Sequence, residues 1–288
     1  MQVTMLADVE ARPRRVAVGE FDGVHLGHRQ VIAGNDTVLT FEPHPLAVVR
    51  PEAAPKLLTS LEARAELIAG LGVQELVLIP FDEQFALQTP QEFIDHVLVE
   101  RLCATHVSVG ENFRFGHGAA GDTDMLGADP RFATRVVRLV EVDGEIVSSS
   151  HIRALVAAGD VEHAARFLGA PFQMRGEVVT GDRRGRDLGF PTANIVPDEQ
   201  LICPGYGVYA ARADGRCAAV SVGVRPTFGL GRALLVEAFI LDFDGDLYGQ
   251  ELRIDFLARL RGERRFDTSE ALVEQMELDV EQTRRLCG

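Results

Sequence analysis

The pattern of apolar and polar positions divides the chain into two parts of different character. In the first part, short β-branched apolar runs alternate with longer segments whose apolar residues recur at helical spacing. Such alternation predicts a parallel sheet covered by helices. The predicted strands are 14–19, 37–41, 75–81, 106–110 and 135–142, and the predicted helices are 58–72 and 89–102.

Both predicted helices begin with capping signals. Thr59 and Glu62 stand three residues apart, which is the spacing of a capping box. Thr89 and Glu92 repeat that spacing, and Pro90 occupies the first helical position, where a missing N–H costs nothing. We therefore expect Thr59 and Thr89 to be N-caps.

The second part of the chain reads differently. Two short helical segments, 148–159 and 160–169, each end in glycine, the usual residue after a helix end. After Pro171, short alternating runs separated by glycine-rich turns predict an antiparallel barrel or sandwich. Within it, DFDGD (242–246) predicts a hairpin turn, since Asp-Gly favours hairpins. The segment 267–286 predicts an amphipathic terminal helix.

This change of pattern predicts two domains, 1–169 and 170–288, which a chain of 288 residues can accommodate. The composition, 46% apolar and 25% charged, is typical of a soluble globular protein. The sequence shows no apolar run of about 18 residues and no apolar signal-peptide segment. Four scattered cysteines without a CxxC pair argue against a zinc site or a disulfide framework. We expect a cytoplasmic protein without a membrane partner.

The charge restricts the possible ligands. A net charge of −14 repels polyanions, so we expect no nucleic-acid partner. The single lysine, Lys56, does not follow a glycine-rich loop, which excludes a Walker P-loop. Phosphate must therefore be held by backbone N–H groups, arginines, histidines or a bound cation. The sequence does not decide between a monomer and a homo-oligomer.

The first candidate site is GEFDGVHLGH, residues 19–28, which follows a predicted strand. A helix beginning near Gly27 places His25 and His28 at its N-terminus, where unpaired N–H groups and the helix dipole favour anions. Gly23 and Gly27 allow a phosphate to approach the backbone. A zinc site is disfavoured because no further ligands stand at metal spacing. An ordinary strand-to-helix turn with surface histidines remains an alternative.

The second candidate site is GDRRGRDLGFPTANI, residues 181–195. Glycines and arginines in a loop can surround a polyphosphate with N–H groups and guanidinium donors. Thr192 and Asn194 share one face of an extended segment, and their oxygens suit Mg²⁺ held together with phosphate. The alternative is a basic surface hairpin.

Both stretches resemble signatures of the prokaryotic bifunctional riboflavin kinase/FAD synthetase (FMN adenylyltransferase) family. The resemblance covers almost the whole chain. It implies an α/β nucleotidyltransferase domain with a Rossmann-like parallel sheet, followed by a six-stranded β-barrel riboflavin kinase domain with a terminal α-helix. Further matching stretches are TFEPHP (40–45), LTSLEARAELIAGLGV (58–73), VGENFRFGHGAAGD (109–122), VSSSHIR (147–153), PGYGVYA (204–210), SVGVRPTFG (221–229) and the segment 236–266.

For the first domain, the resemblance implies transfer of the adenylyl group of ATP to FMN, which gives FAD and pyrophosphate. His25 and His28 would hold the ATP phosphates, and Arg153 would clamp the departing ones. Asn112 and His44 would bind flavin, although His44 also reads as a turn histidine between two prolines. The resemblance assigns further ATP- and phosphate-binding positions to Gly19, Phe21, Asp22, Gly23, Gly27, Ser149 and Ser150.

For the second domain, the resemblance implies phosphorylation of riboflavin to FMN by MgATP. Thr192 and Asn194 would bind Mg²⁺ and the phosphates, and Glu237 would accept the proton of the ribityl 5′-hydroxyl. Because Glu237 lies in the apolar run LLVEAFIL, desolvation should raise its pKa. An outward-facing strand residue is the alternative for Glu237. The resemblance assigns further phosphate contacts to Gly181, Arg184, Gly185 and Arg186.

The chain departs from the family in two places. The segment 29–39 is shorter than is usual in the family, so the helix at the first site should have only one or two turns. Ser150 stands where the family commonly has threonine. The short segment motivates one alternative, a riboflavin kinase with a catalytically silent first domain. A flavin-binding protein without turnover and a nucleotidyltransferase for another phosphate ester are further alternatives.

Overall fold

The computed structural model describes residues 1–180, 190–227 and 231–288. It divides into two compact units, 1–149 and 150–288. The helices α7 and α8 are therefore grouped with the second unit, although the sequence suggested a boundary after residue 169. The exact limits of the domains stay a prediction. Within the described residues, no helix combines the length and the apolar character needed to cross a membrane.

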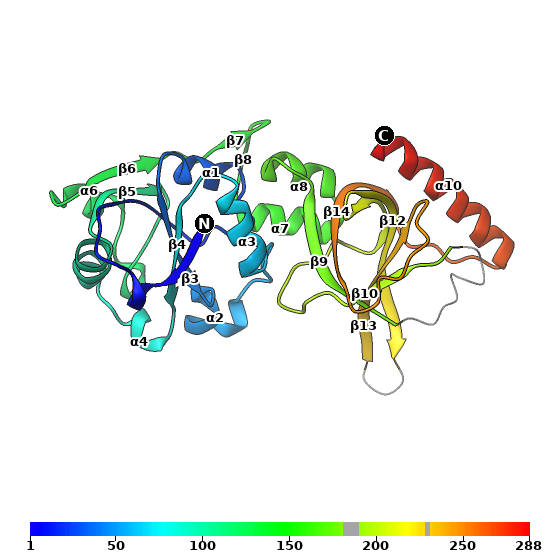
Figure 1. The fold of residues 1–288 in the computed structure, drawn as a ribbon, viewed down its shortest axis with the longest axis horizontal. Coiled ribbons are helices and arrows are strands. Elements are labelled where there is room, and N and C mark those ends of the chain that lie inside the picture. The colour runs from blue at the N-terminus through cyan, green and yellow to red at the C-terminus, as the bar shows by residue number, and fades with distance from the viewer. Residues whose placement is uncertain (181–189, 228–230) are drawn as a thin grey trace. The chain divides into compact units, whose positions relative to one another are not determined.

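The first unit is built on a six-stranded parallel sheet with strand order β1-β4-β3-β2-β5-β6 (Figure 1). Every pair of neighbouring strands runs parallel, as the alternation of strands and helices predicts. The strands are β1 (Gln2–Met5), β2 (Arg14–Val18), β3 (Thr37–Glu42), β4 (Glu75–Pro80), β5 (Ala104–Gly110) and β6 (Ala133–Val137).

Successive residues of the central strands are buried on opposite faces of this sheet. Val16 and Val18 of β2 join one apolar cluster, whereas Ala17 joins the other. Burial on both faces explains why these strands read as continuous apolar runs. The helices of this unit are α1 (Leu26–Ile32), α2 (Pro45–Val49), α3 (Leu61–Ala69), α4 (Glu83–Ala86), α5 (Pro90–Glu92), the π-helical segment η3 (Phe93–Arg101) and α6 (Thr123–Ala128).

The local predictions for this unit met different outcomes. Helix α1 has seven residues, so the short first helix is confirmed. Thr89 and Glu92 form the expected capping box. The N-cap of α3 is Ser60, not Thr59, because the Ser60 hydroxyl accepts the hydrogen bond of the Ala63 N–H. Thr59 instead accepts a hydrogen bond from the distant Gly23 N–H at 3.2 Å.

The single strand predicted over 135–142 is wrong in its second half. Strand β6 ends at Val137, and a separate hairpin follows, formed by β7 (Glu141–Val142) and β8 (Glu145–Ile146). Asp143 and Gly144 between them both have positive φ, 53° and 83°. Two positive φ values in a two-residue loop are typical of a tight hairpin turn.

The second unit contains a closed six-stranded barrel with strand order β10-β13-β12-β11-β14-β9. Its neighbouring strands are antiparallel, which confirms the barrel and removes the sandwich alternative. The strands are β9 (Phe172–Val179), β10 (Ala193–Ile195), β11 (Gly207–Ala213), β12 (Arg216–Thr227), β13 (Gly231–Ile240) and β14 (Glu251–Arg261).

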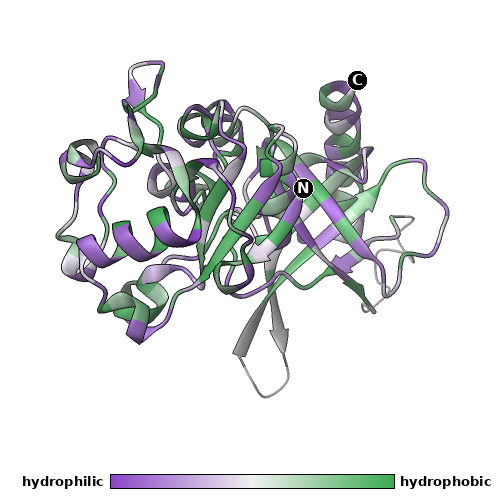
Figure 2. Cartoon of the chain, turned by 60° about the vertical axis from the view of Figure 1, so that its left-hand side comes forward, coloured by the Kyte–Doolittle hydropathy of each residue, from purple (hydrophilic) through white to green (hydrophobic). Residues whose placement is uncertain are grey.

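In the described part of the second half of the chain, the helices are α7 (Ser149–Ala158), α8 (Val161–Leu168) and the terminal α10 (Ser269–Cys287). Figure 2 shows hydrophilic and hydrophobic residues mixed along α10, as expected of an amphipathic helix. The hairpin predicted at DFDGD is wrong, because β13 and β14 are not neighbours in the barrel. The segment 241–250 instead connects two separated strands.

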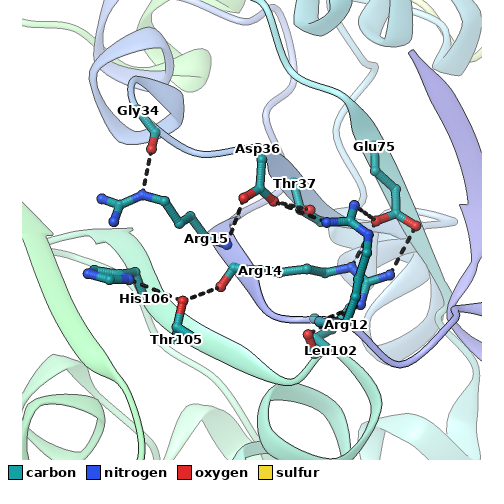
Figure 3. A network of polar contacts seen from close by, with 10 residues as sticks. All are labelled: Arg12, Arg14, Arg15, Gly34, Asp36, Thr37, Glu75, Leu102, Thr105 and His106. Carbon is teal, nitrogen blue, oxygen red and sulfur yellow. Dashed lines mark hydrogen bonds and ion pairs between the residues drawn. The ribbon is translucent and has the colours of Figure 1, made fainter.

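A buried ion-pair network ties β2 to β4 across the intervening strand β3 (Figure 3). Arg14 is 1% exposed, and its Nε donates to a Glu75 carboxylate oxygen at 2.8 Å. Arg12 donates to the same carboxylate at 2.7 Å. Burial alone would raise the pKa of Glu75, but the hydrogen bonds and charges of Arg14 and Arg12 outweigh it and lower the pKa.

We expect Glu75→Gln to lower the free energy of unfolding of the first unit by about 3 kcal/mol at neutral pH, because Arg14 loses its anionic partner. Since the folded-state pKa of Glu75 is lowered, its stabilisation is present above the ordinary value of 4.5 and is lost as the pH falls through the folded-state pKa. The difference from wild type should therefore shrink in acid. Urea unfolding at several pH values measures it.

The matched control is Glu100→Gln, which removes a carboxylate that is 64% exposed and paired with His96. This change should alter the free energy of unfolding by less than about 1 kcal/mol. Equal effects of the two substitutions would contradict the importance of the buried network.

Candidate active sites

The turn between β2 and α1 has a constrained backbone. Phe21 and Val24 have positive φ, 53° and 41°, which is costly for residues with a Cβ. A Cβ at Gly27 would lie 3.2 Å from the His25 ring, and a Cβ at Gly19 would lie 3.1 Å from the Phe21 ring. The structure thus gives Gly19 and Gly27 a packing reason in addition to the predicted approach of phosphate.

The buried carboxylate of Asp22 holds this turn in place. It accepts hydrogen bonds from the N–H groups of Leu58 at 2.8 Å and Thr59 at 3.1 Å. The Asp22 carbonyl accepts another from the Ser149 hydroxyl at 2.9 Å. Because the Asp22 carboxylate is engaged by backbone donors, it acts here as an anchor. Contacts of Asp22, Gly23 and Ser149 with phosphate stay predictions.

The two histidines of the turn lie ring to ring. Their centroids are 3.5 Å apart with 16° between the planes, and the Phe21 ring meets His28 edge-on at 5.3 Å. His25 is the N-cap of α1, and its Nδ1 accepts the His28 N–H at 3.2 Å. A ring nitrogen that accepts carries no proton, so the neutral His25 has its proton on Nε2.

Both imidazoles are neutral at neutral pH. Burial lowers the pKa of His25 to about 4. Burial, followed by the charges of His25 and Arg64, holds the pKa of His28 well below 6.5. The two side chains therefore offer N–H donors to an anion and not positive charges.

The remaining candidates of the first unit lie at the same edge of the sheet. The histidine turn follows β2, His44 follows β3, and Asn112 follows β5, and these three strands are neighbours. The chain continues from β2 to one side through β3 and β4, and later to the other side through β5 and β6. Ligands of open α/β sheets bind at the carboxyl ends of the strands where the order reverses.

His44 has two neighbours of its own. Its Nδ1 accepts the Leu46 N–H at 3.1 Å, so it caps α2, and its Nε2 lies 2.6 Å from a Glu20 carboxylate oxygen. The turn histidine suggested as an alternative is thus present in the structure. Flavin binding by His44 and by the exposed Asn112 stays a prediction.

Arg153 and Ser150 lie on α7 and belong to the second unit. The guanidinium of Arg153 donates to the Ser150 hydroxyl at 3.4 Å. Their assignment to the ATP phosphates stays a prediction.

The second unit contains a cavity of about 970 Å³. It is lined by the three residues that the sequence singled out, Thr192, Asn194 and Glu237. The barrel register places Asn194 of β10 opposite Glu237 of β13, and Ser221 of β12 opposite Glu237 on the other side. Gly181, Arg184, Gly185 and Arg186 lie outside the described residues.

Side chains of strand β13 alternate between two faces, a point that the sequence alone did not decide. Val236 and Ala238 are fully buried, whereas the partly exposed Glu237 lines the cavity between them. Glu237 therefore points away from the buried core of the barrel and toward the cavity. Its action as a base stays a prediction.

Sequence reasoning missed a large part of the cavity wall. Helix α10 supplies apolar side chains such as Leu272 and Met276, which the helical spacing had marked only as an amphipathic face. Arg261 of β14 donates to the Asp279 carboxylate of α10 at 2.8 Å, and Gln275 supports that carboxylate at 3.0 Å. A pattern within one element of the sequence does not indicate which residues of a separate element it contacts. The misjudged segment 241–250 also contributes to the wall, through residues 243–248.

These features are those of two enzyme units. The first resembles a nucleotidyltransferase, with a parallel sheet and a histidine-containing turn. The second resembles a kinase, with a barrel and a cavity lined by Thr192, Asn194 and Glu237. A family model described as FAD synthetase matches residues 8–151, and one described as riboflavin kinase matches residues 168–287. The chain belongs to the bifunctional riboflavin kinase/FMN adenylyltransferase family.

Relatives of that name match along nearly the full length. The protein of Listeria monocytogenes is 38% identical over 93% of this chain and 91% of its own. The proteins of Bacillus subtilis and Escherichia coli K12 are 36% and 34% identical, over 94% and 95% of this chain and 91% and 92% of their own.

A crystal structure from Streptococcus pneumoniae shares the fold, with a TM-score of 0.90, 30% identity and 99% coverage of both chains. That protein is named a macrolide-efflux protein. The fold classes predicted for both parts of the chain are confirmed.

We expect the imidazole of His25 to titrate with a midpoint near 4 in the folded chain, because burial disfavours its charged form. NMR titration of the ring Cε1–H signals measures this directly. His96 is the internal control, since its hydrogen bond with Glu100 raises its pKa above 6.5. A midpoint of His25 near that of an exposed histidine would contradict the neutral pair.

Proposed function

We propose that this chain makes FAD from riboflavin in two ATP-dependent reactions, one in each unit, with the residues placed above. Its membership of the bifunctional family, which covers nearly the whole chain, supports both activities. The observation that carries the assignment of residues is the register of β10 and β13, which sets Asn194 against Glu237 in the cavity.

In the second unit, riboflavin and MgATP occupy the cavity of about 970 Å³, a size usual for small-molecule sites. Glu237 accepts the proton of the ribityl 5′-hydroxyl as that oxygen attacks the γ-phosphorus of ATP. The products are FMN and ADP. The Arg261–Asp279 ion pair keeps α10 against the barrel, so Leu272 and Met276 can cover the apolar ring system of the flavin.

The donor set around Thr192 suits Mg²⁺ bound together with phosphate. The Asn194 side-chain amide donates through Nδ2 to the Thr192 carbonyl, which leaves its Oδ1 as an acceptor for a cation. Among the described residues, no group of three or more His, Cys, Asp or Glu could hold a metal. This arrangement agrees with Mg²⁺ bound by few protein oxygens and completed by phosphate and water, where it neutralises phosphate charge.

In the first unit, the FMN phosphate attacks the α-phosphorus of ATP, and pyrophosphate leaves. His25 and His28 donate hydrogen bonds to the phosphates at the start of α1, where backbone N–H groups add to them. Such stabilisation is electrostatic and needs no covalent intermediate. Arg153 takes the departing pyrophosphate, Asn112 and His44 contact the flavin, and Mg²⁺ accompanies ATP here also.

The second candidate function is a riboflavin kinase with a silent first unit, and the seven residues of α1 motivate it. The anchored turn with its paired histidines favours the two-step enzyme. A chromatographic time course with riboflavin, ATP and Mg²⁺ decides between them. FMN followed by FAD supports the first proposal, FMN alone supports the second, and no product would support a flavin carrier. The cytoplasmic location stays a prediction.

We expect Glu237→Gln to lower FMN formation by about 10²- to 10⁴-fold, because an amide cannot accept the hydroxyl proton. FAD formation from supplied FMN should remain. The two rates are measured separately on the same protein. Glu251→Gln, on the non-adjacent strand β14, is a matched control that should change neither rate. Loss of both activities in Glu237→Gln would contradict two separate sites.

The converse substitution is His28→Ala, which should lower FAD formation from FMN by about 10²- to 10³-fold through loss of a phosphate donor. FMN formation should continue at the wild-type rate. His96→Ala serves as the control, since His96 is 59% exposed on η3. An unchanged FAD rate would remove His28 from the mechanism.

A further inference from the structure

A buried arginine on α3 has one donor left over. Arg64 is 3% exposed, and its guanidinium donates to the Glu20 carbonyl at 2.8 Å through Nη1 and to the Glu42 carboxylate at 2.7 Å through Nη2. Its Nε–H is buried and has no hydrogen-bond partner among the described residues. Buried donors are rarely left unsatisfied in native proteins, so this one calls for an explanation.

A complementary atom lies in the adjoining turn. The Nδ1 of His28 is also buried without a hydrogen-bond partner in the part of the chain that the structure describes. Glu20, which Arg64 binds, immediately precedes Phe21, whose ring contacts that of His28. The charge of Arg64 also acts on the His28 imidazole. The arginine Nε–H can only donate, and Nδ1 of a neutral imidazole can accept.

We propose that Arg64 is the positioning residue of His28: its Nε–H donates to His28 Nδ1 through one water molecule and fixes the ring with its proton on Nε2. The proposal rests on the phosphate-binding role given to His28 above. His25 already has this tautomer, because its Nδ1 accepts the His28 N–H. Both stacked rings then present Nε2–H donors to the same anion.

The geometry requires an arginine and not merely a cation. Two nitrogens of one planar group donate to the Glu20 carbonyl and the Glu42 carboxylate, and the third, Nε, is the donor assigned to the His28 ring. A lysine side chain ends in one ammonium nitrogen on a flexible chain, so it cannot donate hydrogen bonds in all three of these directions. Arg64→Lys therefore keeps the charge and removes the orientation of His28.

The first test is on the wild-type chain and does not depend on any variant folding. The ring-nitrogen chemical shifts of His28, measured by long-range ¹H–¹⁵N NMR at neutral pH, report its tautomer. The proposal requires a protonated Nε2 and an Nδ1 that accepts a hydrogen bond. A His28 ring with its proton on Nδ1 overturns it.

The second test is Arg64→Lys, which should lower FAD formation from FMN on the order of 100-fold, the effect of a misplaced catalytic group. In the same variant, FMN formation by the other unit should be unchanged, and the NMR signals of His28 should show a mixture of tautomers. The matched control is Arg14→Lys, at the buried Arg14–Glu75 pair of the same unit (Figure 3). That variant should keep both the FAD rate and the His28 tautomer.

The outcomes separate this inference from the proposed site. If His28→Ala is inactive in FAD formation while Arg64→Lys retains the wild-type rate and tautomer, the positioning role is overturned and the site stands. If Arg14→Lys loses FAD formation to the same extent as Arg64→Lys, the loss is one of general stability and the inference is also overturned. Full activity of His28→Ala would overturn the proposed site itself.

Discussion

The arrangement of the first unit depends on one carboxylate that is kept from water. Asp22 accepts backbone hydrogen bonds from Leu58 and Thr59, residues far from it in the sequence. A buried charge is tolerated only when donors surround it, so this turn and the start of α3 must assemble together. That assembly holds the strained backbone around Phe21 and brings Arg64 beside the histidines. The turn at which anion binding is proposed is thus held in place by contacts within the protein.

In the second unit, the candidate site depends instead on the two-residue period of side chains along a strand. Because side chains alternate between faces, Val236 and Ala238 can fill the core while Glu237 faces the cavity. The barrel register then aligns Asn194, Glu237 and Ser221 across three adjacent strands. A shift of one residue in any of these pairings would turn a cavity residue into the core, so packing of the core also preserves the site.

The sequence predicted those features whose causes are local. The alternation of strands and helices, the capping box at Thr89 and the short α1 all depend on neighbouring residues, and all three are confirmed. The failures have long-range causes. The sequence predicts Thr59 as a helix N-cap, but its hydroxyl accepts a hydrogen bond from the N–H of Gly23 in another segment. The wall that α10 gives to the cavity arises from the Arg261–Asp279 contact between separate elements, which no spacing within either element reveals.

Helix α10 is fastened mainly along its second half. Arg261 binds Asp279, Asp242 binds Arg284, and Arg212 donates to the carbonyl of Cys287. The first half gives the cavity its apolar residues Leu272 and Met276 instead. Opening of the first turns therefore costs less free energy than detachment of the helix. The part of the cavity wall that α10 supplies is therefore the less firmly held half of the helix, so this side of the cavity can open at a lower free-energy cost than the barrel strands can separate.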